Sequence, residues 1–217
     1  MAEILLRNKN KISYNILGGN FVYILFEGLD RCGKSTVVDY IIERLQNISI
    51  QPITLRTKEL AGMYIPSLKG TVPNEVIYML YWQAIRRADI EIVEPALKES
   101  KIVLEDRGCG SNIAYSYWKD IDPNFKETVD NLYMDHCIKP DLILFFKSSY
   151  PTFLERKAEH RMLKEKDYNK VSNNYEIWIQ KLLERGYNIE IVNDFEKVED
   201  KCIYSFSLIN NLLKLEV

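Results

Sequence analysis

Short apolar runs alternate with longer helical patterns along most of the chain. The apolar runs are typical of strands buried on both faces of a sheet, and we expect strands at 21–26, 48–55, 101–104, 142–146 and 189–192. Helical spacing predicts helices at 34–45, 74–97, 125–137, 152–164, 175–185 and 197–213, with Pro95 kinking or ending the second of them. This alternation predicts a three-layer α/β/α fold around a parallel five-stranded sheet with right-handed crossovers.

The length of the chain favours a single domain. Its 217 residues suit one α/β unit better than two. Residues 1–20 carry weak signals and end in a Gly-Gly-Asn turn cluster. We therefore expect an N-terminal extension of unknown role at 1–20, followed by one domain at 21–217.

The overall charge narrows the choice of partner. Twenty-nine basic and 31 acidic residues give a net charge of -2, which provides no general attraction to nucleic acid or anionic membranes. No basic stripe or aromatic reader motif appears either. We expect small-molecule partners, with no nucleic acid and no membrane.

Cysteine usage and the N-terminus indicate the cellular compartment. Four cysteines form no CxxC pair and no spacing typical of a metal site, so we interpret them as reduced thiols. The sequence shows no signal-peptide pattern and no apolar run near the ~20 residues of a membrane span. These features predict a cytoplasmic protein.

One segment carries a strong chemical signal. GLDRCGKS at 28–35 matches the pattern G-x-x-x-x-G-K-[ST], directly after a buried strand and at the start of a helix. Such a loop surrounds phosphates with backbone N–H groups, while Lys34 reaches the β- and γ-phosphates and the Ser35 hydroxyl binds magnesium. A chance glycine-lysine turn is the alternative, which the flanking strand and helix disfavour. We predict a P-loop that binds nucleotide phosphates and Mg²⁺, although the motif does not say which reaction follows.

The residues around this loop resemble the thymidylate kinase family. FEGLDRCGKST at 26–36 carries the resemblance, with further matches in the family's order. These are YWQAIR at 81–86, EPAL at 94–97, VLEDR at 103–107, Ser111 with Ala114 and Tyr115, KPDL at 139–142, LER at 154–156, and Asp167 with Tyr168. The resemblance extends from about residue 21 to the C-terminus and implies a P-loop kinase with a helical lid.

The resemblance also implies roles for individual residues. The ATP site would comprise Gly28, Asp30, Arg31, Cys32, Gly33, Lys34, Ser35 and Thr36. Lys34 and Arg31 would neutralise the transferring group, Ser35 and Asp106 would organise magnesium, and Arg107 would hold the acceptor phosphate. Catalysis is thus assigned to Lys34, Arg31, Asp106 and Arg107. For Arg31 the alternative is a solvated surface arginine, and for Asp106 and Arg107 a structural ion pair.

The acceptor site and the lid are assigned in the same way. The resemblance implies that Asp30, Arg56, Arg107, Ser111 and Tyr115 contact the acceptor, while Trp82 and Arg86 read its base. Trp82 and Arg86 are four residues apart and so share a helix face. A core tryptophan beside a surface arginine is the alternative, and Arg87 competes with Arg86. Arg156 and Arg161 are predicted lid residues, or else part of a solvated charged helix face.

Two departures from the family pattern concern the acceptor. Gly108 and Gly110 stand where larger side chains are usual, which predicts a widened pocket that Trp82 could partly refill. The predicted reaction is ATP-dependent phosphorylation of dTMP to dTDP, in pyrimidine deoxynucleotide biosynthesis. The alternatives are another or 5-modified deoxynucleotide, a deoxynucleoside (since Glu105 precedes Asp106 and Arg107), or an inactive nucleotide-binding regulatory protein. The resemblance also makes a homodimer an open possibility.

Overall fold

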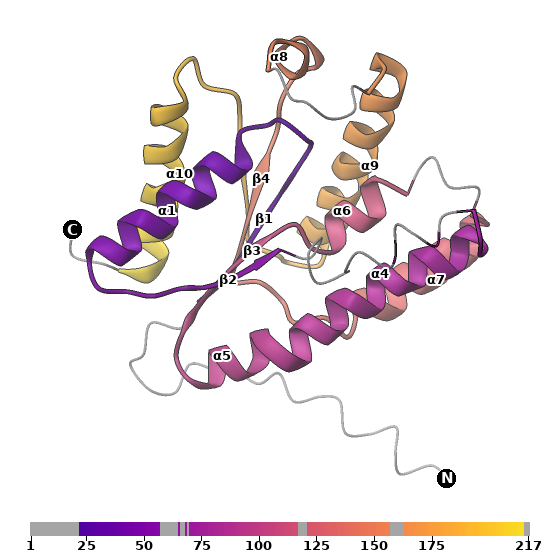
Figure 1. Cartoon of the computed structure of the whole chain (residues 1–217), viewed down its shortest axis with the longest axis horizontal. Coiled ribbons are helices and arrows are strands. Elements are labelled where there is room, and N and C mark those ends of the chain that lie inside the picture. The colour runs from indigo at the N-terminus through magenta and orange to yellow at the C-terminus, as the bar shows by residue number, and fades with distance from the viewer. Residues whose placement is uncertain are drawn as a thin grey trace.

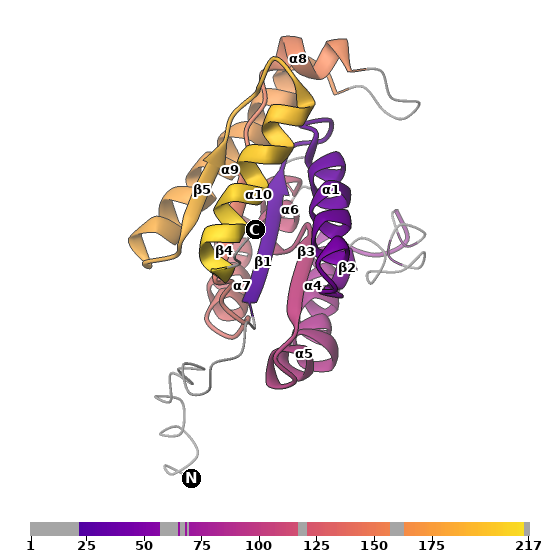
Figure 2. The same cartoon turned by 90° about the vertical axis from the view of Figure 1, so that its left-hand side faces the viewer.

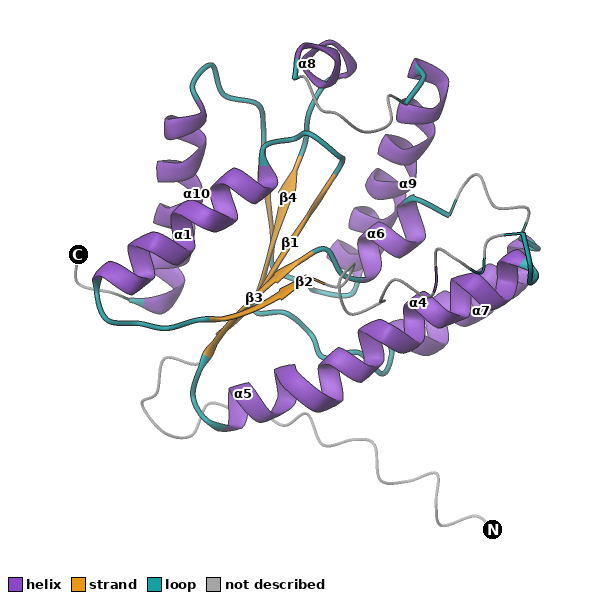
Figure 3. Ribbon diagram, viewed as in Figure 1, coloured by secondary structure: helices purple, strands orange, loops and turns teal. Residues whose placement is uncertain are grey.

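A parallel sheet forms the centre of the molecule in the computed structural model, which describes residues 22–56, 65, 68, 70–116, 121–156 and 163–214 (Figures 1 and 3). The strands are β1 (Val22–Gly28), β2 (Ile53–Arg56), β3 (Ile102–Asp106), β4 (Leu142–Phe146) and β5 (Ile189–Val192). Their spatial order is β2-β3-β1-β4-β5, and every neighbouring pair is parallel. The predicted five-stranded parallel sheet is confirmed.

Helices cover both faces of this sheet (Figure 2). They are α1 (Lys34–Asn47), α4 (Asn74–Ala88), the π-helix Asp89–Val93, α5 (Glu94–Lys98), α6 (Cys109–Ala114), α7 (Pro123–Met134), α8 (Tyr150–Glu155), α9 (Glu165–Glu184) and α10 (Val198–Leu213). On one face α1 packs against α10, and on the other α6 packs against α9 and α4 against both α6 and α7. This arrangement is the predicted three-layer α/β/α architecture.

The central strand β1 shows why the sequence needs helices on both sides. Ile24 and Phe26 are fully buried in the core beneath α1 and α10, whereas Leu25 belongs to the core beneath α4, α6 and α9. Successive residues of a strand point to opposite faces, so a run that is apolar at every position must be covered twice.

The strand ends determine where a ligand can bind. Phe26 of β1 and Arg56 of β2 are each in register with Asp106, the last residue of β3. Because all the strands are parallel, their carboxyl ends share one edge, which is where open parallel sheets bind ligands. In Figure 1 this edge faces α8 and the loop that leads into α10.

Several boundaries differ from the sequence predictions. Helix α9 begins at Glu165, ten residues before the predicted start, because Tyr168, Val171 and Tyr175 form one buried stripe and Glu165 and Asp167 favour the first turn. The expected helix at 74–97 is interrupted by the π-helix, and Pro95 occupies the first turn of α5. The expected helix at 152–164 is seen as α8, and 157–162 lie outside the described residues, as do 1–21.

No helix in the described part of the chain has the length and apolarity to cross a membrane.

Candidate active site

The loop between β1 and α1 wraps tightly because of its two glycines. Gly28 has φ of +148°, and a Cβ there would lie 2.4 Å from the Phe146 carbonyl oxygen. Gly33 has φ of +83° and is the N-cap of α1. Because glycine has no side chain, the first N–H groups of the helix receive no side-chain cap. A helix N-terminus without a side-chain cap attracts an anion. The loop therefore has the backbone of a phosphate site.

Lys34 and Asp106 join the loop to the end of β3. The Lys34 ammonium contacts the Asp106 carboxylate, and both side chains are almost fully buried. Burial lowers the pKa of Lys34 to about 7, and the nearby Arg107 guanidinium acts in the same direction. Ser35 and Thr36 are exposed in the first turn of α1. Cys32 is buried, so only its backbone can contribute to ligand binding.

Arg107 lies at the centre of a hydrogen-bonded group at the same edge. Its Nη1 donates to the Gly28 carbonyl (3.1 Å) and to Ser111 Oγ (3.2 Å), and its Nη2 donates to Asp30 Oδ1 (2.6 Å). The Tyr115 hydroxyl accepts from the Asp30 N–H (2.8 Å), and the guanidinium lies over the Tyr115 ring. The structure thus brings four predicted acceptor-site residues together.

Glu27 supports this group, and the sequence analysis assigned it no role. Its carboxylate is fully buried and accepts from the N–H groups of Gly108 (2.9 Å) and Ser111 (3.0 Å) and from the Ser111 hydroxyl (2.7 Å). The Tyr175 hydroxyl lies 3.1 Å from Glu27 and 2.8 Å from Ser111 Oγ. An acidic residue within an apolar strand was the sequence signal for such a role.

Arg31 and Arg156 link the loop to α8. The Arg31 guanidinium lies 4.6 Å from the centre of the Phe153 ring and donates to the Phe153 carbonyl (3.3 Å). In the other direction, Arg156 Nη1 donates to the Arg31 carbonyl (2.7 Å). Arg156 is therefore placed beside the phosphate loop, and Arg161 lies outside the described residues.

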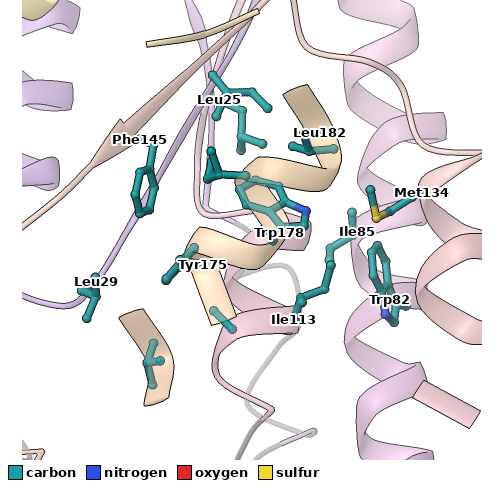
Figure 4. Packing of buried hydrophobic residues seen from close by; sticks show 14 of the residues in the cluster. Leu25, Leu29, Trp82, Ile85, Ile113, Met134, Phe145, Tyr175, Trp178 and Leu182 are labelled. Atoms are coloured by element: carbon teal, nitrogen blue, oxygen red, sulfur yellow. The ribbon is translucent and has the colours of Figure 1, made fainter. Parts of the chain in front are cut away.

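Trp82 lies in the hydrophobic core rather than at an open acceptor pocket. Its side chain is fully buried, its Nε1 donates to Asp130 (3.2 Å), and its ring stacks on Tyr133 with centroids 5.2 Å apart. Figure 4 shows Trp82 in the same hydrophobic cluster as Ile85 and Met134. A ring packed in this way leaves no face for a nucleotide base. The structure corrects the predicted base-stacking role and places Trp82 where the core alternative put it.

The three other arginines considered for the acceptor occupy different surroundings. Arg56 ends β2 and pairs with Asp39 of α1 at 3.7 Å, with both side chains exposed. Arg86 pairs with the buried Asp89 at 3.5 Å, whereas Arg87 is exposed and binds Glu91. Arg86 and Arg87 line one surface cavity of about 420 Å³.

Gly108 and Gly110 do not widen the pocket. A Cβ at Gly110 would lie 2.6 Å from the Trp178 ring, which is buried on α9, and a Cβ at Gly108 would lie 3.1 Å from Leu25 Cδ1. Trp178 thus fills the space beside Gly110, and Trp82 is not needed there. The prediction of a widened pocket is wrong because a side chain from a distant helix occupies that space.

Glu105 is also turned away from the candidate site. Its carboxylate is buried, accepts a hydrogen bond from the Tyr23 hydroxyl and lines a small cavity of about 30 Å³ together with Asp89. Consecutive strand residues face opposite sides of the sheet, so Asp106 and Glu105 cannot both face the phosphate loop. The deoxynucleoside kinase alternative depended on Glu105 acting beside Arg107, and the position of Glu105 does not support it.

Comparison with known proteins agrees with this geometry. The family model for thymidylate kinase matches residues 26–201. Three curated relatives are thymidylate kinases: those of Oceanobacillus iheyensis (30% identical; 64% of this chain and 65% of the relative), Brachyspira hyodysenteriae (31%; 68% and 73%) and Fervidobacterium nodosum (25%; 82% and 93%). The segment matched by the family model contains the last three residues of β1, strands β2 to β5, the phosphate loop and the Asp106–Arg107 strand end. The chain therefore belongs to the thymidylate kinase family.

Proposed function

We propose that this protein transfers the γ-phosphoryl group of ATP to dTMP, producing ADP and dTDP for pyrimidine deoxynucleotide synthesis. One observation carries the proposal: Lys34 and Arg107 converge on the same sheet edge, each positioned by a carboxylate, Asp106 and Asp30 respectively. Two cationic groups beside a phosphate loop suit two anionic substrates. Family membership identifies phosphoryl transfer as the reaction.

The proposed chemistry requires no covalent enzyme intermediate. An oxygen of the acceptor 5′-phosphate attacks the γ-phosphorus, and the bond from that phosphorus to the β,γ-bridging oxygen breaks, leaving its electron pair on ADP. Such transfer depends mainly on positioning and on neutralising charge. Lys34 would neutralise the donor phosphates, and Arg107 would orient the acceptor phosphate. Arg31 would leave Phe153 to reach the transferring group.

The loop residues fit a magnesium ion. Among the described residues, no group of three or more His, Cys, Asp and Glu side chains could hold a metal. A P-loop Mg²⁺ needs only one or two protein ligands because phosphates and water supply the rest. The exposed Ser35 hydroxyl and the Asp106 carboxylate are the proposed ligands. A bound Mg²⁺ would supply positive charge to offset the negative charge that develops on the phosphates.

Thymidylate is the proposed acceptor because the widened pocket that would favour a bulkier acceptor is not present beside Gly110. Trp178 occupies the space that Gly110 was predicted to open. Ser111, Tyr115 and Asp30 remain proposed acceptor contacts because they surround Arg107. Arg56 remains one because it ends the strand beside Asp106. Arg86 remains the proposed base-reading arginine.

An acceptor panel tests the proposed function. ATP consumption with magnesium should be selective for dTMP over other nucleoside monophosphates, 5-substituted deoxyuridylates and free deoxynucleosides. Lys34→Ala should reduce turnover by about a hundredfold to a thousandfold, as expected when a phosphate-neutralising group is removed. Preference for another acceptor would contradict the thymidylate assignment. Tight ATP binding without turnover on any acceptor would instead support a regulatory protein.

We further propose a homodimer in the cytoplasm whose kinase domain begins near residue 21. Support for pairing comes from Val76, Met79 and Ile90, which are exposed apolar residues of α4 and the π-helix. The family match from residue 26 supports the domain boundary. Sedimentation velocity should give a mass near twice 25.5 kDa, and Met79→Glu should shift the protein toward monomer.

A further inference from the structure

A buried lysine on the C-terminal helix contacts the back of the phosphate loop. Lys201 of α10 has only 1% of its surface exposed. Its ammonium donates to the Cys32 carbonyl (3.1 Å) and to Asp194 Oδ1 (3.1 Å). A buried ammonium is costly unless it is paired and hydrogen-bonded, so these two partners determine where the group sits.

Asp194 connects this lysine to the segment that precedes the predicted lid. Its carboxylate accepts from Lys201, from the Ser148 hydroxyl (3.0 Å) and from the Ser149 N–H (3.2 Å), and it pairs with Arg156 at 3.5 Å. Although burial opposes ionisation, hydrogen bonding and charge from Lys201 outweigh it and lower the pKa of Asp194. Asp194 is thus a fixed anion that orients two cationic side chains.

Both cations hold consecutive carbonyl groups of the loop. Arg156 Nη1 donates to the Arg31 carbonyl at 2.7 Å, and Lys201 Nζ donates to the Cys32 carbonyl at 3.1 Å. Both side chains also pack against Gly33, because a Cβ on this glycine would lie 3.6 Å from Arg156 Nη1 and 3.9 Å from Lys201 Cδ. The two contacts therefore act on adjacent peptide groups of one loop.

The geometry of the peptide bond relates these carbonyl contacts to the direction of the N–H groups that bind phosphate. In a trans peptide, the C=O of one residue and the N–H of the next point in opposite directions. Holding the carbonyls of Arg31 and Cys32 toward α8 and α10 directs the N–H groups of Cys32 and Gly33 to the opposite side, into the loop. Preorganised N–H groups of this kind bind phosphate without paying for reorganisation.

We propose that Lys201, anchored by Asp194, is a positioning residue of the donor phosphate site, and that it acts with Arg156 to orient the phosphate-binding amides. This inference rests on the proposed function only in taking ATP as the donor. The sequence signal was weak: Lys201 shares a buried stripe with Ser205, Ile209 and Leu213 at intervals of four residues on an otherwise amphipathic helix.

The test measures Mg·ATP binding by calorimetry without any acceptor. Lys201→Met should weaken binding about tenfold, whereas Lys201→Arg should stay within about threefold of wild type. In steady-state kinetics the KM for ATP should rise while the KM for the acceptor stays unchanged. Ser205→Ala is the matched control, because this buried residue lies one turn further along the same helix, where its hydroxyl donates to the Lys201 carbonyl (2.8 Å). It should lower the melting temperature and leave ATP binding unchanged.

Asp194→Asn separates positioning from simple charge and remains informative if Lys201→Met does not fold. Removing a carboxylate near a phosphate site should tighten ATP binding if charge alone matters, whereas loss of the Lys201 anchor should weaken it. Wild-type affinity in Lys201→Met, or tighter binding in Asp194→Asn, would overturn the inference. A protein that binds ATP but does not phosphorylate dTMP would contradict the proposed function and leave this test intact.

Discussion

At the scale of single residues, the candidate site consists of charged groups that are already held in place. Lys34 contacts Asp106, while Arg107 is fixed by Asp30 and Ser111. Groups held in this way need little reorganisation when a phosphate arrives. These groups must nevertheless be charged to bind a phosphate, and Lys34 is the one whose lowered pKa brings its charge into question near neutral pH.

ATP binding should depend on pH through Lys34. Burial lowers its pKa to about 7 in the free protein, even though its ammonium touches Asp106, so the amine is increasingly neutral above that pH. A bound phosphate favours the charged form, so binding takes up a proton. Affinity for Mg·ATP should therefore fall by up to about tenfold per pH unit between pH 7 and 9.

Calorimetry in buffers of different ionisation enthalpy measures both the affinity and the proton uptake. Lys34→Arg is the matched control, because arginine stays protonated throughout this range. Its affinity should change little between pH 7 and 9. A wild-type protein with an equally flat profile would show that Lys34 is already fully charged before ATP binds.

Gly110 should be intolerant of any side chain while Trp178 is present. Gly110→Ala places its Cβ 2.6 Å from the Trp178 ring and 3.0 Å from Glu27 Cδ, which should cost about 1–3 kcal/mol of unfolding free energy. Combining it with Trp178→Leu should recover part of that loss, as a double-mutant cycle in urea would show. Strictly additive effects would mean that the ring does not fill this space.

At the scale of elements, the sequence predicts regular structure well and interruptions poorly. The apolar run at 142–146 identified β4 to the residue, because a strand buried on both faces is apolar at every position. The bounds of β5 were also predicted to the residue, although this strand contains Glu190 and is only partly buried. The π-helix at 89–93 has no such signature, since the buried positions 85, 89, 93 and 97 recur every four residues, a spacing that an α-helix also gives. Trp82 and Trp178 show a similar limit of sequence prediction at the candidate site. The spacing of residues predicts which side chains share a helix face, whereas tertiary packing determines which other residues that face contacts.

Asp89, the first residue of the π-helix, should make stability fall as pH rises. Burial raises its pKa to about 6 from the ordinary aspartate value of 3.8, although the Ile138 N–H and Arg86 partly offset this. Between these two values the unfolded chain ionises while the folded chain stays protonated. The stabilisation present at low pH is therefore lost as pH rises through about 6, and the loss amounts to about 3 kcal/mol.

Asp89→Asn removes that titration and keeps an acceptor for the Ile138 N–H. The variant should be more stable than wild type at pH 7 by about 1–3 kcal/mol, and the difference should shrink toward pH 4. Urea unfolding at several pH values measures it. Glu91→Gln is the control, because this half-exposed residue two positions away should give a profile parallel to wild type. A parallel profile for Asp89→Asn would rule out a raised pKa.

At the scale of the whole molecule, stability and function compete at one edge of the sheet. The parallel strands end together, so the fold concentrates Lys34, Asp106 and Arg107 where a ligand can reach them. Two buried charges contribute little net stability as a pair, but removing one leaves the other unpaired. The site should therefore be dispensable for folding only when both partners are replaced.

At pH 6, where Lys34 is charged, Lys34→Met and Asp106→Asn should each cost about 3–5 kcal/mol of unfolding free energy, because each leaves one buried charge without its partner. The double variant should regain most of that stability while all three variants lose turnover. Urea unfolding and ATP consumption measure the two properties on the same samples.

Lys147→Met with Glu176→Gln is the control, since that pair is half-exposed and its loss should change stability by less than about 0.5 kcal/mol. If the two site substitutions were additive in stability, the pair would not be energetically coupled. Recovery of stability without recovery of activity would instead show that this buried pair is retained for phosphoryl transfer rather than for folding.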